Sequence, residues 1–90
     1  MEEEIKKITE QIIFLEKIAK QFMTKEAIAR YGNLKIAHPE IALKAISLIA
    51  NAAQLGQIKD KITDEDFKTL LLEIQKGKKS YRLNFRNGKV

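Results

Sequence analysis

The segment HPEIALKAISLIANAAQLG, residues 38–56, determines the fold expected for this chain. Pro39 suits the first position of a helix, where its missing N–H would have no partner, and Gly56 suits the residue just past the end. The segment is therefore predicted to form one helix of about four and a half turns. At 100° per residue the polar side chains that follow Pro39 share one narrow strip, and the remaining positions are Ile, Leu or Ala. A helix with a single polar strip must be covered on most of its sides, which makes this the central helix of a small bundle. The strip consists of Glu40, Lys44, Ser47, Asn51 and Gln54.

The first helix is predicted over residues Met1–Met23, with glutamates near its start and lysines near its end. Its apolar residues recur at steps of three and four, which predicts one continuous stripe that faces the bundle. Ile13 and Phe14 fall off this stripe. Either they are partly covered by the C-terminal tail or the central helix, or the leading half of the helix packs against another copy as a short coiled coil. The stripe consists of Ile5, Ile8, Ile12, Leu15, Ala19 and Phe22.

Two further helices flank the central one. Thr24 is a suitable N-cap for a short helix over Lys25–Tyr31, and Gly32 is its expected stop. Asn33–Ala37 would then form a loop that carries Leu34 and Ile36 toward the core, with His38 extended because it precedes proline. Ile58 and Ile62 are expected core anchors. A capping box of Thr63 and Asp66 predicts a last helix over Asp64–Lys76, whose core side is formed by Phe67, Leu70, Leu71 and Ile74.

Length and composition exclude several classes of protein. Ninety residues form one domain with a small core. One His and no Cys exclude a cysteine nucleophile and metal sites built from thiolates or several imidazoles. We therefore expect no catalytic residues, no metal, no cofactor and no enzymatic activity. The sequence has no apolar start of the signal-peptide kind and no apolar run near 18 residues, so no membrane segment is expected. We expect a cytoplasmic protein with access to a nucleoid, or a nuclear one if the source is eukaryotic.

The basic residues are concentrated at the C-terminal end. The net charge is +5, yet residues 76–90 contain six cations and no acid, so the rest of the chain carries a charge of −1. Within this end Tyr81, Leu83 and Phe85 alternate with Arg82, Asn84 and Arg86, a spacing typical of extended chain. We predict an all-α bundle of three to four helices over residues 1–76, followed by a basic extended tail over residues 77–90. Cations gathered at one terminus are typical of proteins that bind polyanions.

The order of residues resembles a known family. The segments AKQFMTKEAIARYGNL, LKIAHPE, AAQLGQIKDKITDEDFKTLL and KSYRLNF are similar to the double-stranded-DNA-binding family that includes programmed cell death protein five and its archaeal counterparts. The most specific part is GQIKDKITDE, residues 56–65. The resemblance begins near Ile18, so residues 1–17 would be a helical extension and residues 18–76 the family core. It implies duplex DNA binding without sequence preference, and protein partners in eukaryotes.

The candidate nucleic-acid-binding residues follow from the resemblance and from the basic tail. The resemblance implies basic positions in the core, and the tail adds the six cations of residues 76–90, which would contact phosphates without reading sequence. A charged terminus can also be merely solvated. Tyr81 and Phe85 could stack on bases, but sharing a face with Leu83 favours docking on the bundle. The candidates are Arg30, Lys35, Lys59, Lys61, Lys76, Lys78, Lys79, Arg82, Arg86 and Lys89.

The expected function is sequence-nonspecific binding of double-stranded DNA, and RNA would satisfy the same electrostatics. The alternative is a protein-interaction adaptor that meets its partners through Ile13, Phe14 and Leu72. The chain is expected to be a monomer.

Overall fold

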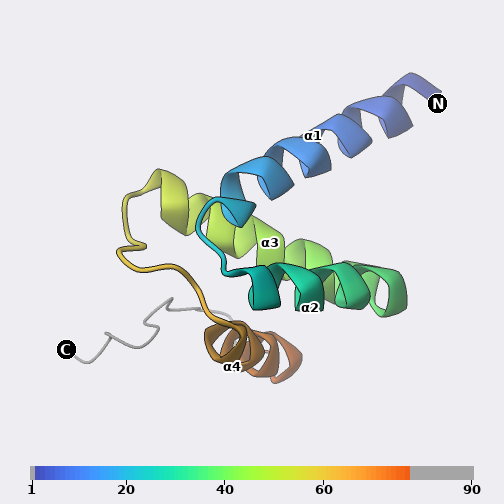
Figure 1. Cartoon of the computed structure of the whole chain (residues 1–90). Coiled ribbons are helices and arrows are strands. Elements are labelled where there is room, and N and C mark those ends of the chain that lie inside the picture. The colour runs from blue at the N-terminus through green and yellow to red at the C-terminus, as the bar shows by residue number, and fades with distance from the viewer. Residues whose placement is uncertain (1, 78–90) are drawn as a thin grey trace.

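The computed structural model describes residues 2–77 as four α-helices arranged in a small bundle (Figure 1). Within that range it contains no strand, and its β-type pairing is limited to an isolated parallel bridge between Met23 and Ile62. The predicted all-α class is therefore confirmed. The expected extended tail over residues 77–90 lies outside the described residues except for Gly77. The helices are α1 (Glu2–Lys20), α2 (Lys25–Ala37), α3 (Pro39–Gln54) and α4 (Asp64–Gln75).

α3 is the central helix, as the sequence predicts. It packs against α1, α2 and α4, and each of these lies on a different side of it (Figure 1). Pro39 occupies its first turn, and Gly56 follows its last turn with φ of 73°, the left-handed region that glycine adopts without a Cβ clash. Six of its residues are buried, which is what a helix with one polar strip requires. They are Ala42, Ala45, Ile46, Ile49, Ala50 and Ala52.

α2 is longer than predicted, because Gly32 does not end it. The helix continues through Gly32 and ends at Ala37, where His38 adopts φ of −140° and ψ of 75° before Pro39. A glycine inside a helix costs only about 1 kcal/mol, whereas the residue before proline is forced out of the helical region. The restriction on His38 is therefore the stronger of the two effects, and it ends α2. The predicted loop over Asn33–Ala37 is wrong, and so is the inward placement of Ile36, which is 84% exposed.

α1 ends earlier than predicted and is only half packed. It stops at Lys20, after which Gln21 and Phe22 form a turn and Met23 forms a backbone bridge with Ile62. Its N-terminal half projects away from the other helices, as Figure 1 shows. Ile5 and Ile8 are mostly exposed, so the prediction that the whole apolar stripe faces the bundle is wrong for its leading half. Only the second half of α1 lies against α3.

The core is closed by aromatic and aliphatic side chains from every helix. Tyr31 of α2 and Phe67 of α4 meet edge to face, with ring centroids 6.5 Å apart and an interplanar angle of 82°. Ile62 is fully buried and Ile58 packs against the core, which confirms both anchors. The Thr63 and Asp66 capping box begins α4 as predicted. None of the four described helices is both long and apolar enough to cross a lipid bilayer.

Candidate nucleic-acid interface

Two of the candidate residues, Arg30 and Lys35, lie on α2. Arg30 is exposed, and its guanidinium forms a two-pronged ion pair with Asp64, the first residue of α4. Its Nη2 donates to Asp64 Oδ2 at 3.1 Å, and its Nε donates to Oδ1. This bond lowers the pKa of the Asp64 carboxyl below its ordinary value and raises the pKa of Arg30. The pair forms part of the wall of a groove of about 520 Å³ between α2 and α4. The charge of Arg30 is therefore balanced within the molecule.

Lys35 belongs to a second charged cluster, between α1 and α2. Its Nζ donates to Glu16 Oε2 at 2.6 Å, and the hydroxyl of Tyr31 donates to the same oxygen at 2.6 Å. Lys20 completes the cluster, with its Nζ 5.8 Å from the centroid of the Tyr31 ring. Glu16 is 8% exposed, and no other charged side chain among the described residues is buried. The cluster ties α1 to α2, which otherwise have few contacts.

The two ionisable groups at the centre of this cluster have shifted pKa values. Burial alone would raise the pKa of Glu16, but the hydrogen bonds from Lys35 and Tyr31 outweigh burial and hold it below its ordinary value of 4.5. Burial, together with the bond to Glu16, raises the pKa of Tyr31. The carboxylate is therefore ionised and the phenol neutral across the physiological range.

Lys59 and Lys61 lie on the connection between α3 and α4. This connection is held in place by two backbone hydrogen bonds to the turn after α1, from Ile62 N–H to Phe22 O at 2.7 Å and from Thr24 N–H to Ile62 O at 2.9 Å. Because Ile62 points into the core, its neighbour Lys61 is exposed, and Lys59, the neighbour of Ile58, is exposed as well. Within residues 2–77 neither lysine forms an ion pair. Both are free to meet an external anion.

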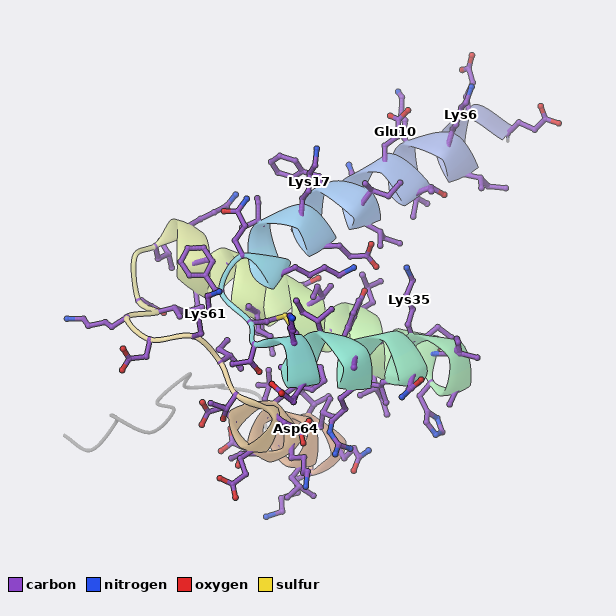
Figure 2. The ribbon with its side chains drawn as sticks, in the orientation of Figure 1. Lys6, Glu10, Lys17, Lys35, Lys61 and Asp64 are labelled. Carbon is purple, nitrogen blue, oxygen red and sulfur yellow. The ribbon has the colours of Figure 1, made fainter. Side chains whose placement is uncertain are left out.

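Figure 2 shows that two of the candidates, Lys35 and Lys61, lie well apart. Lys61 lies near the beginning of α2, whereas Lys35 lies near its other end. Lys76 is exposed at the end of α4. The remaining candidates, Lys78, Lys79, Arg82, Arg86 and Lys89, are outside the described residues. All 12 acids and 12 of the 17 basic residues lie within residues 2–77, so the described part is formally neutral.

Sequence reasoning missed both ion pairs. The partners of Arg30 and Lys35 are 34 and 19 residues away, beyond the reach of helical periodicity. One signal was available for Glu16, which lies four residues after Ile12 and three before Ala19, on the apolar stripe of α1. A carboxylate on such a stripe must have a partner when it is buried. For Asp64 the capping role explains its position, and nothing in the sequence indicates Arg30 as its partner.

The described residues also offer no group of three or more His, Cys, Asp or Glu side chains that could hold a metal ion. Glu2, Glu3 and Glu4 follow one another along the exposed first turn of α1, and Asp64, Glu65 and Asp66 open α4 as N-terminal charges. Acidic residues at these positions stabilise the helix start by interaction with unpaired backbone N–H groups. Stabilisation of the helix starts therefore accounts for both groups of acidic residues.

Comparison with known proteins identifies the family. A DNA-binding protein of Thermococcus sibiricus is 34% identical over 85 residues, which cover 93% of this chain and 76% of the relative. A DNA-binding protein of Cenarchaeum symbiosum is 35% identical over 71 residues, covering 79% and 75% of the two chains. A DNA-binding protein of Thermococcus kodakarensis is 37% identical over 73 residues, covering 81% and 65%. No solved structure matches this chain.

The family model described as the double-stranded DNA-binding domain matches residues 1–87, which includes α1 as well as the region from Ile18 onward that carries the resemblance. The resemblance found in the sequence is thereby confirmed. The chain belongs to the double-stranded DNA-binding domain family, that of programmed cell death protein five and its archaeal counterparts.

Proposed function

We propose that this protein binds double-stranded DNA through its phosphates and without sequence preference. Membership of the double-stranded DNA-binding domain family is the observation that carries this proposal. Exposed lysines supply the chemistry, because a lysine that neutralises a phosphate releases condensed counterions whatever the base sequence is. Phosphate contacts position a protein on the duplex without reading its sequence, so this mode of binding needs no recognition helix.

The candidate residues fall into two groups by their intramolecular partners. Lys59, Lys61 and Lys76 are exposed and form no ion pair within the described residues, so they are proposed as primary phosphate contacts. The tail cations Lys78, Lys79, Arg82, Arg86 and Lys89 are proposed to join them, because no acid follows Glu73 in the sequence. Arg30 and Lys35 are proposed as secondary contacts. Each would have to exchange its carboxylate partner for a phosphate, which reduces the free energy that it contributes to binding.

The tail contribution is tested by changing its charge and keeping its length. In the test variant Lys78, Lys79, Arg82, Arg86 and Lys89 are all changed to Gln. In the matched control the same number of lysines is changed to Gln at positions outside the proposed contacts, namely Lys6, Lys7, Lys17, Lys44 and Lys68. Fluorescence anisotropy with a labelled duplex gives the affinity at several salt concentrations. If all six cations of residues 76–90 met phosphates, the log-log salt slope would be about −5, and about −3 if half did.

We expect the dependence of affinity on salt to become much weaker in the tail variant and to stay unchanged in the control variant. Equal losses in both variants would show that net charge alone attracts DNA and would contradict a specific role of the tail. Single-stranded DNA and RNA of the same length serve as competitors. Preference for the duplex supports the proposal, and preference for RNA would replace DNA by RNA as the partner.

A second candidate function, that of a protein-interaction adaptor, is favoured by exposed apolar side chains. Ile13, Phe14 and Leu72 are 52%, 57% and 56% exposed. An adaptor should keep specific partner proteins bound at high salt, where contacts to phosphates are weakened. Changing Ile13 and Phe14 to Gln should release them while the far-UV circular dichroism stays unchanged. Retention that is insensitive to these changes would count against the adaptor.

A further inference from the structure

The groove between α2 and α4 has apolar residues on both of its sides. Its volume is about 520 Å³. Leu34 of α2 and Leu71 of α4 line it, and both are partly buried because they also pack against the core. Ala29 and Ala37 line it from α2 and are exposed, and their short side chains leave the groove open. An apolar segment laid in the groove would therefore contact apolar side chains from two helices.

The charges of this groove favour a cationic occupant. Arg30 and Asp64 both line it, and they are paired with each other. Glu26 lines it as well, is exposed and forms no ion pair within residues 2–77. One acid is thus left over among the residues that line the groove. A segment that carries arginines beside apolar residues matches both the apolar lining and this charge.

The end of α4 lies close to the groove. Gly77 closes the last turn, where its N–H donates to Ile74 O at 3.0 Å, and its φ of 75° turns the chain away from the helix axis. Along α4, Gly77 lies about 9 Å beyond Leu71 and about 20 Å beyond Asp64. A fully extended chain can reach back about 13 Å over four residues and about 26 Å over eight. Residues 81–86 are therefore long enough and near enough to span the groove.

The sequence of residues 81–86 has two faces when the segment is extended. Its apolar residues stand at every second position and alternate with Arg82, Asn84 and Arg86. We propose that this segment docks in the groove between α2 and α4 with its apolar face inward. Docking removes that face from water and leaves both arginines pointing outward, where they can meet a phosphate. The docking itself does not depend on DNA binding. The inward residues are Tyr81, Leu83 and Phe85.

A second groove, which is lined by Ile12 and Leu43, suits the segment less well. Its volume is only about 210 Å³, and the charges of its lining residues Lys35 and Glu40 cancel. It also faces α1, and α2 and α3 lie between α1 and α4 (Figure 1). The groove between α2 and α4 is therefore the site to which the segment is assigned.

Paramagnetic relaxation enhancement in the full chain, measured without DNA, tests the docking. The sequence has no cysteine, so Asn84→Cys gives a single attachment site for a nitroxide spin label. Asn84 alternates with the apolar residues, so the label leaves the docked face free. It should broaden the amide signals of Ala29, Asn33 and Leu71, which line the groove, and leave that of Ile5 unchanged.

Substitutions on each side of the contact should abolish this broadening. Leu83→Gln with Phe85→Gln removes most of the apolar face of the segment. Ala29→Lys with Ala37→Lys places long cationic side chains in the groove, where they fill the space and repel the arginines. In both variants the signals of Asn33 and Leu71 should sharpen.

The matched control is Gln11→Lys with Gln54→Lys, which adds the same charge at exposed helix positions outside the groove and should keep the broadening. Far-UV circular dichroism verifies that each variant is folded. In an equal mixture of spin-labelled chain and isotope-enriched chain without a label, the broadening should be absent, because each segment docks in its own molecule.

Three results would overturn the proposal. The first is broadening that is spread evenly over the described helices, that centres on another face or that survives Leu83→Gln with Phe85→Gln. The second is a control variant that loses the broadening as the Ala29 and Ala37 variant does, because net charge alone would then hold the segment. The third is broadening in the mixture, which would make the occupant a segment of another copy.

Discussion

At the residue scale, Glu16 is a buried carboxylate that two other side chains hold in place. It is nearly buried and accepts hydrogen bonds from both Lys35 and Tyr31, each at 2.6 Å. A buried carboxylate is tolerated only when such partners replace the water that it loses. Removing the carboxylate also leaves the hydroxyl of Tyr31, a residue that is only 2% exposed, without its acceptor. Glu16 therefore acts as the polar link between α1 and α2.

We expect Glu16→Ala to lower the free energy of unfolding by about 1–3 kcal/mol, the cost of leaving a buried polar group unpaired. Glu10→Ala is the control, because Glu10 is an exposed residue on the same helix, and it should change the free energy by less than about 0.5 kcal/mol. Urea unfolding followed by circular dichroism measures both. A Glu16 variant as stable as the Glu10 variant would show that the cluster contributes nothing to stability.

The lowered pKa of Glu16 also predicts a pH dependence. The folded carboxyl has a pKa below its ordinary value of 4.5, so its stabilising contribution is fully present above pH 4.5 and is lost as the pH falls through the folded pKa. The difference in unfolding free energy between the natural sequence and Glu16→Gln should therefore be constant from neutral pH down to about 4.5 and shrink below it. Urea unfolding at a series of pH values measures this difference. A difference that grows in acid would contradict the assignment.

At the element scale, helix ends are predicted best from the sequence where a residue acts directly on the backbone beside it. Pro39 and Gly56 locate α3, and Thr63 with Asp66 locates the start of α4, because these residues act on adjacent backbone groups. The end of α2 was predicted wrongly, since helix propensity at Gly32 is weak compared with the restriction that Pro39 imposes on His38. The exposure of Ile5 and Ile8 could not be predicted either. Periodicity shows which residues share a face of a helix, but not how much of that face another helix covers.

Substitution by alanine is expected to have opposite effects on stability at Gly32 and at Gly56. Gly32 lies inside α2 without a positive φ, and an added Cβ would meet nothing within 4 Å, so Gly32→Ala should stabilise the protein by about 0.5–1 kcal/mol. Gly56 has the same open space but φ of 73°, so Gly56→Ala should destabilise it by about 1 kcal/mol or more. Thermal unfolding of both variants measures the difference. A destabilising Gly32→Ala would contradict the continuous α2.

At the scale of the whole molecule, the basic residues divide between those paired inside the bundle and those left exposed. Sequence reasoning could identify Lys59 and Lys61 as outward-facing, because each adjoins a core anchor, Ile58 or Ile62. It could not recognise that Arg30 and Lys35 are compensated, since their carboxylate partners come from other helices. Family membership supports nucleic acid as the ligand, and the geometry ranks the residues proposed to contact it.

If Arg30 is a phosphate contact limited by its internal partner, releasing it should strengthen DNA binding. Asp64→Asn removes the carboxylate that holds Arg30, and Glu40→Gln, on α3, removes one negative charge from a residue without an ion pair in the described structure. Because an exposed ion pair is weak, Asp64→Asn should tighten binding by no more than about fivefold relative to Glu40→Gln. Fluorescence anisotropy with one duplex measures both. Equal effects would show that Arg30 does not contact DNA.

The central claim is that this protein holds duplex DNA by its phosphates. The most direct measurement is its affinity for two duplexes of equal length and unrelated sequence, followed by anisotropy across a range of salt concentrations. We predict affinities that agree within about threefold at every salt concentration, and log-log slopes near −3 for both duplexes. A preference of 100-fold or more for one duplex, or an affinity that does not change with salt, would contradict it.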